Sequence, residues 1–306
     1  MSEPARERTT TLACLLVVAA AWTASLAYLS ARGSGLAQPV ISMAVTGLAL
    51  PALVVWLTRG GRPPPTPVYK PGRELVFVLG YLVIYAFYFL GWALGAVREA
   101  TEAGLYQDIT VLLLKLGVGV SAPAVMLYLL GAQVGPLFDA GVKRKGFWPI
   151  LLIVGPLVAA LVVLASGSAG IARTLALPPQ VLLWATPAAF AWVALETLSE
   201  EFLYRAVLQS RLAAVLESQA GAVLVSALLF SLAHAPGIYL RGNADTLGRS
   251  SDLAQVVAYT VAVMTPIGIL YGTIWARTRS LLLVTLVHAC LSFTPRIAEI
   301  ASTLGG

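Results

Sequence analysis

The sequence predicts an all-α protein, a polytopic membrane helix bundle of about eight or nine transmembrane helices. Of its 306 residues, 58% are apolar and 11% are charged, and the mean hydropathy is +0.85. Soluble domains average about half apolar residues and about a quarter charged ones. Many apolar stretches are also long enough to cross a bilayer as helices. No segment shows the alternation of apolar and polar residues that is typical of membrane β-strands.

The long apolar stretches follow one another along almost the whole chain. They cover residues 10–31, 36–57, 75–97, 109–131, 147–168, 180–199 with an extension to about 215, 220–239, 253–275 and 280–295. Helices are expected because backbone polar groups in lipid must be paired within the protein. The first stretch resembles a signal peptide, but its length and the spans that follow it predict an uncleaved first helix.

The net charge of +6 reflects membrane topology. With the N-terminus in the cytoplasm, 12 of the 20 cations lie on the inner side, 6 lie on the outer side and 2 fall within spans. This asymmetry follows the positive-inside rule, so it does not indicate a nucleic-acid partner. Lys143–Lys145 could also contact anionic lipid, although topology alone explains these cations. We expect an integral protein of a prokaryotic plasma (inner) membrane, with the lipid bilayer as one partner.

The unusual polar residues are concentrated in the second half of the chain. We therefore predict that residues 1–146 are N-terminal transmembrane scaffold helices and that residues 147–306 form the catalytic transmembrane core. Loop 59–74, rich in proline, glycine and cations, and loop 135–146 are expected inner connections. The two cysteines lie in apolar stretches and indicate no disulfide framework.

One apolar helix carries the segment ETLSEEFLYR. Ionisable side chains are costly in hydrocarbon, so they are rare there and usually functional. Glu201 and Arg205 are four residues apart and can form an ion pair, while Glu200 points about 100° away and aligns with Glu196. A neighbouring carboxylate and a low-dielectric setting would make Glu200 a plausible general base. The alternative is a helix end at the cytoplasmic surface with a solvated salt bridge.

The only two histidines in the sequence, His234 and His288, lie in two further apolar helices. A lone buried histidine is usually structural, but the same pattern in both histidines, downstream of the glutamates, favours a joint site. Such a site requires the helix that continues to about 215 to be shifted or tilted, so that Glu200 lies nearer the middle of the membrane. Lys115 is expected to pair with Asp108 or to extend toward the interface.

Three motifs in this order resemble those of a known family. Glu200-Glu201-x-x-x-Arg205, Phe230-x-x-x-His234 and His288-x-x-x-Ser292 are similar to the motifs of the CAAX-processing and bacteriocin-immunity family (CPBP, or Abi) of intramembrane endopeptidases. The resemblance covers roughly residues 150–295.

The resemblance implies a catalytic role for each motif residue. Glu200, assisted by His234, would activate a water against a scissile carbonyl, and Glu201 with Arg205 would brace the helix. His288 and Ser292 would stabilise the oxyanion. The family usually has Asn in place of Ser292; a hydroxyl still donates one hydrogen bond, but its reach differs from that of an amide. The implied substrate is a membrane-tethered, lipidated or sorting-tail protein, cleaved near the membrane.

Two alternatives remain open at this point. No H-E-x-x-H motif is present, and no cofactor is expected, but Glu200, His234 and His288 could hold zinc with one open position. The same residues could instead handle protons or a ligand in a non-hydrolytic transporter or immunity protein.

Overall fold

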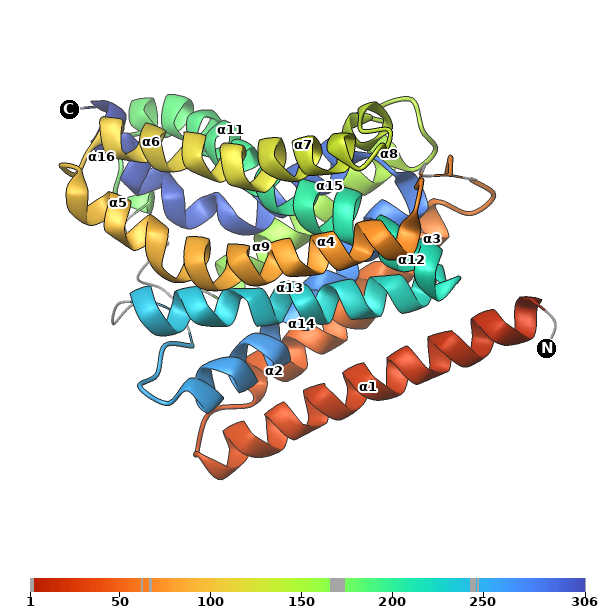
Figure 1. The fold of residues 1–306 in the computed structure, drawn as a ribbon. Helices are drawn as coiled ribbons and strands as arrows, with labels where there is room; N and C mark the ends of the chain where they lie inside the picture. Colours follow the sequence, from red (N-terminus) through yellow and green to blue (C-terminus); the bar gives the residue numbers. More distant parts are fainter. Residues whose placement is uncertain are drawn as a thin grey trace.

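The computed structural model describes residues 3–61, 63–65, 68–165, 174–242, 246 and 248–305. These residues form helices joined by turns and loops, with no strand among them, and the longest helices run roughly side by side (Figure 1). The predicted all-α class is confirmed.

Several spans are built from two α-helices joined through a π-helical segment. The helices are α1 (Glu3–Ala31), α2 (Ala37–Ser42), α3 (Leu50–Leu57), α4 (Pro71–Ile84), α5 (Leu94–Ala100), α6 (Leu105–Leu116), α7 (Ala122–Leu129), α8 (Phe147–Pro149), α9 (Gly155–Ala165), α11 (Pro179–Glu201), α12 (Ser210–Leu216), α13 (Gln219–Arg241), α14 (Leu253–Thr278), α15 (Leu281–Ser292) and α16 (Ile297–Gly305). The π-helical segments are Met43–Ala49, Tyr85–Ala93, Gly117–Ser121, Ile150–Val154 and Phe202–Gln209, and short 3-10 turns cover Gly135–Phe138 and Thr294–Arg296.

Within the described residues, seven helices are long and apolar enough to cross a membrane, or eight if one bent pair is a single span. The predicted stretch 280–295 does not form one straight helix. It breaks between Ser292 and Thr294, and the two arms are bent by 61°. A proline disfavours helical backbone in the residue before it, and Pro295 directly follows Thr294. The predicted stretch 147–168 forms a shorter apolar helix, Phe147–Leu161, and its last residues lie outside those described.

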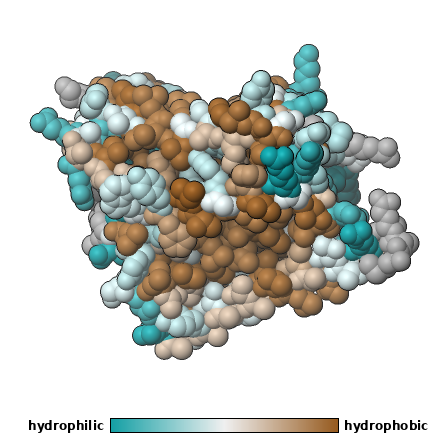
Figure 2. All heavy atoms as spheres, viewed as in Figure 1, coloured by the Kyte–Doolittle hydropathy of each residue, from teal (hydrophilic) through white to brown (hydrophobic). Residues whose placement is uncertain are grey.

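Apolar side chains cover much of the visible surface. In Figure 2, brown residues occupy the middle of the molecule and teal residues gather toward its ends. Leu183 is 80% exposed and Leu129 is 76% exposed, which is costly in water but favourable against lipid tails. The chain is an integral membrane protein; its orientation and its prokaryotic origin stay predictions.

Two close helix contacts position the elements that carry the motifs. A Cβ at Gly268 of α14 would lie 2.9 Å from Ala227 of α13, so only glycine allows α14 to pack this closely against the helix of His234. A Cβ at Gly119 would lie 2.5 Å from Ser199, next to Glu200. Small residues at helix contacts are typical of membrane bundles. The main core contains residues from both predicted segments, and the boundary at 146 stays a prediction.

A buried ion pair ties α4 to α12 at one end of the bundle. Arg211 Nε lies 3.0 Å from Glu74 Oε2, and neither side chain is exposed. The other oxygen of Glu74 accepts hydrogen bonds from the backbone N–H groups of Tyr69 and Lys70 at 2.9 and 2.8 Å. The carboxylate therefore also closes the turn that leads into α4.

Candidate active site

One continuous helix of 38 residues, Pro179–Leu216, carries both motif glutamates. At about 1.5 Å per residue it is about 57 Å long, nearly twice the hydrocarbon thickness of about 30 Å. Glu200 and Glu201 lie just past its midpoint, and Glu201 has no exposed surface. This geometry does not fit a solvated salt bridge at a helix end.

Glu201 forms a buried three-residue network. Its Oε2 lies 3.1 Å from Nε of Arg205, one turn later on the same helix, and neither side chain is exposed. Its Oε1 lies 2.7 Å from Nδ1 of His288 on α15. A carboxylate only accepts hydrogen bonds, so Nδ1 of His288 donates to it. This network links α11 to α15 across 87 positions of the chain.

Glu200 and His234 form a second, looser pair. Glu200 Oε2 lies 3.7 Å from Nε2 of His234, and the two side chains are 24% and 22% exposed. Nδ1 of His234 lies 2.7 Å from the backbone carbonyl of Phe230. Because a carbonyl only accepts, Nδ1 carries a proton and neutral His234 has a bare Nε2 that faces the carboxylate.

Aromatic rings hold the motif side chains in place. The Phe230 ring packs edge-on against His234 at 4.5 Å and lies 4.9 Å from the guanidinium carbon of Arg205. Tyr204 packs edge-on against Phe230 at 5.1 Å, and Tyr271 stacks on His288 at 4.5 Å. The sequence analysis missed both tyrosines. Tyr204 lies four residues after Glu200, so helical spacing could have predicted that it lies near the site. No spacing to a motif residue on its own helix indicates Tyr271.

Ser292 is the last residue of α15, one turn after His288, and it is half-buried. Within the described part of the chain, its hydroxyl has no hydrogen-bond partner. The structure thus brings Glu200 close to His234, and it brings Glu201 close to Arg205 and His288. In the described residues the Ser292 hydroxyl, one turn after His288 on the same helix, has no hydrogen-bond partner.

The predicted pairing of Lys115 with Asp108 is wrong. Its actual partner also removes one reason for expecting Glu200 to act as a base. Lys115 Nζ lies 3.4 Å from Glu196 Oε1, so the lysine pairs with Glu196 rather than with Asp108. Arg296 Nη2 also lies 3.7 Å from that oxygen. Glu196 is therefore neutralised, and repulsion from it cannot be what makes Glu200 a base. The Lys115–Glu196 contact joins α6 to α11, so the spacing of residues within one helix could not predict it.

The predicted zinc ligands do not form a ligand cluster. Among the described residues, no three His, Cys, Asp or Glu side chains are arranged to hold a metal ion. Nδ1 of His288 is committed to Glu201, and the Glu200 and His234 atoms face each other. As arranged here, these residues do not fit a metal ion.

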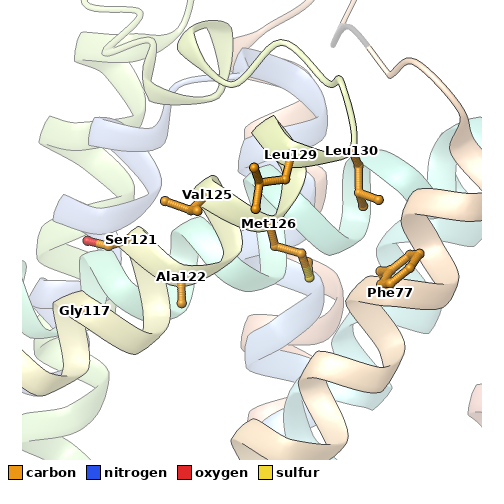
Figure 3. Close-up of a pocket in the computed structure, with 8 residues that line it drawn as sticks. All are labelled: Phe77, Gly117, Ser121, Ala122, Val125, Met126, Leu129 and Leu130. Carbon is orange, nitrogen blue, oxygen red and sulfur yellow. The ribbon is translucent and has the colours of Figure 1, made fainter.

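Three apolar hollows are lined by described residues, and two of them lie beside the motif helices. One of about 660 Å³ lies between Phe77 of α4 and residues 117–130, and Figure 3 shows that it contains no motif residue. A second, of about 530 Å³, includes Ala233 and Ala235 on either side of His234. A third, of about 550 Å³, includes Leu198 and Thr285, close along the chain to Glu201 and His288. The helices that hold the site thus border two apolar hollows.

Comparison with protein families identifies the part of the chain that holds the site. The family model described as type II CAAX prenyl endopeptidase Rce1-like matches residues 179–294. Residues 179–294 are thus similar to the Rce1-like family. The Rce1-like segment runs from the first residue of α11 to just beyond Ser292, so it contains all three motifs, and the resemblance predicted from them is confirmed. The match indicates CAAX-type intramembrane protease activity. A comparison with curated proteins and one with solved structures found no match.

Proposed function

We propose that this protein is an intramembrane endopeptidase that hydrolyses a peptide bond with a water activated by Glu200 and His234. The observation that carries the proposal is the partly exposed Glu200–His234 pair, held beside a buried Glu201–Arg205–His288 network. The side chains of the pair retain exposed surface, whereas those of Glu201 and Arg205 have none.

The geometry of the pair supports general-base catalysis. Neutral His234 turns its bare Nε2 toward the Glu200 carboxylate. Two facing acceptors are satisfied by one water that donates a hydrogen to each, with a small widening of the 3.7 Å gap. Glu200 takes one proton as the water oxygen attacks the scissile carbonyl carbon. That proton then passes to the leaving nitrogen as the C–N bond breaks.

The oxyanion role assigned to His288 has a protonation requirement. Because Nδ1 donates to Glu201, neutral His288 has no hydrogen on Nε2. It can donate to an oxyanion from Nε2 only as the imidazolium. Ser292, whose hydroxyl is uncommitted, would supply a second donor. One such donor is worth about 3–4 kcal/mol in the transition state.

The proposed substrate is a membrane-tethered, lipidated or sorting-tail protein that is cleaved near the membrane. It would enter from lipid or along the inner face, because the hollows beside α13 and α15 are apolar. We propose the plasma membrane of a prokaryote as the location, with a cytoplasmic N-terminus.

The test is a cleavage assay with the purified protein in detergent, challenged with a library of transmembrane and lipidated peptides and read by mass spectrometry. Cleavage that survives chelators supports the glutamate mechanism. Loss on chelation with recovery on adding zinc would favour a zinc enzyme. No cleavage, together with proton-coupled flux in liposomes, would favour a transporter and overturn the proposal.

A further inference from the structure

Arg279, at the turn between α14 and α15, is a buried cation with spare donors. Its side chain is almost entirely enclosed, since only 7% of the residue is exposed. Nη2 donates to Gln219 Oε1 at 2.8 Å, but Nε and Nη1 are buried without a partner among the described residues. Arginine presents five donors in a fixed fork, so most of this fork is unused.

The other buried arginines show what Arg279 lacks. Arg205 has the Glu201 carboxylate at 3.1 Å and Arg211 has the Glu74 carboxylate at 3.0 Å. In the part of the chain that the structure describes, no carboxylate lies within ion-pair distance of Arg279. Burial, together with the nearby positive charge of Arg144, lowers the pKa of Arg279 to about 10. The C-terminal end of α14 offsets part of this charge, but it is not a counter-ion.

More cations lie on the loop that covers this turn. Arg144 donates from Nη1 to the carbonyl of Thr278 at 2.6 Å and also pairs with Asp139. The backbone of Leu281 donates to the carbonyl of Asp139 at 3.1 Å, which fixes the loop on the turn. Lys143 and Lys145, on either side of Arg144, are exposed. Buried and accessible cations thus occupy one end of the bundle, near α8 and α12 in Figure 1.

The ligand that fits is an anion with several acceptor oxygens. We propose that loop 139–145 and the α14–α15 turn form a binding site for a phosphate group, contacted by Arg144 and its flanking lysines and favoured by Arg279 from beneath. Guanidinium groups match phosphate geometry, and Gln219, the partner of Arg279, begins α13, whose N-terminal end also favours an anion. Two sources share this chemistry, an anionic phospholipid and free phosphate. Val142 and Trp148, 37% and 54% exposed, flank the cations as side chains at a lipid interface do.

The site is tested by thermal unfolding of the full-length protein in a zwitterionic detergent, followed by tryptophan fluorescence. The probes are phosphatidylglycerol, phosphatidylcholine and inorganic phosphate, added at constant ionic strength. We expect phosphatidylglycerol to raise the unfolding midpoint while phosphatidylcholine does not. Removing one charge from the site should weaken binding about tenfold, so Arg279→Gln should need about tenfold more phosphatidylglycerol for the same shift.

The matched control is Arg73→Gln, which removes an exposed cation from the start of α4 and should leave the response unchanged. Equal protection by inorganic phosphate would support the site and identify a soluble ligand. If Arg279→Gln does not fold, Arg279→Lys, which keeps the charge, should retain most of the response, and its complete loss would count against the proposal. The proposal is wrong if neither phosphate source protects the wild-type protein more than phosphatidylcholine does, or if the Arg279 and Arg73 variants respond alike.

Discussion

The two neighbouring glutamates of α11 sit in opposite environments. Glu201 is fully buried, and its two oxygens are bonded to Arg205 and His288 at 3.1 and 2.7 Å. Glu200 is 24% exposed, and its nearer oxygen lies 3.7 Å from His234. Adjacent residues on a helix point about 100° apart, so one position along the chain separates a closed network from an open pair.

The difference indicates how the site divides its work. A buried hydrogen-bonded network restrains the helices that it joins, and Glu201 joins α11 to α15 through His288. The open pair keeps capacity for a water and a substrate, and catalytic hydrogen bonds are often long before substrate binds. We therefore assign the chemistry to Glu200 and His234 and the support to Glu201 and Arg205, and the following experiments can break that assignment.

Glu200→Gln should have the largest effect on activity. The amide cannot take a proton from water, so kcat/KM should fall by about 10²–10⁴-fold, the usual contribution of a general base. Peptide cleavage measures the loss, and the midpoint of thermal unfolding should barely move. Glu7→Gln, which changes an exposed glutamate near the N-terminus, is the control. Full activity in Glu200→Gln would remove the proposed base.

Glu201→Gln should act mainly on stability. It leaves Arg205 as a buried charge without a partner, which costs about 3–5 kcal/mol, measured as a lower free energy of unfolding. The double variant Glu201→Leu with Arg205→Met removes both charges and should recover much of that loss. A stable but inactive Glu201→Gln variant would instead indicate that the network takes part in the chemistry.

Ser292→Ala should have a moderate effect. Losing an oxyanion donor costs about 10²–10³-fold in kcat, and we expect about tenfold here because a hydroxyl reaches less far than an amide. Stability should stay within about 0.5 kcal/mol, as for other changes away from buried networks. Ser292→Asn should keep wild-type activity or exceed it. An unchanged kcat in Ser292→Ala would show that the oxyanion is stabilised without this hydroxyl.

The smallest expected effect is read from the wild-type protein, with one variant used only to assign the signals. Because the chain has two histidines, ¹⁵N-histidine labelling gives two sets of imidazole signals, which His288→Asn assigns. We expect the His234 signals to report a protonated Nδ1 and a bare Nε2, and the His288 signals to report an Nδ1–H bonded to a carboxylate. A His234 that is protonated only on Nε2 would contradict the water arrangement proposed for Glu200.

Local spacing predicted much of the site. Four-residue spacing on one helix was enough to predict the Glu201–Arg205 pair. The lengths of the apolar stretches were enough to predict most of the spans, because hydrocarbon thickness fixes how long a spanning helix must be. The order of the three motifs was enough to predict the family resemblance, and the family-model match to residues 179–294 confirms it.

The sequence by itself thus determined the membrane class and the resemblance of residues 179–294 to a protease family, and it predicted the candidate site residues. Only the tertiary structure decided how those residues are paired: His288 with Glu201, His234 with Glu200, and Lys115 with Glu196. It also revealed Tyr271 against His288 and the break after Ser292. The physical reason is that helix periodicity fixes contacts within about one turn, whereas partners 34 to 87 positions apart depend on how the helices pack.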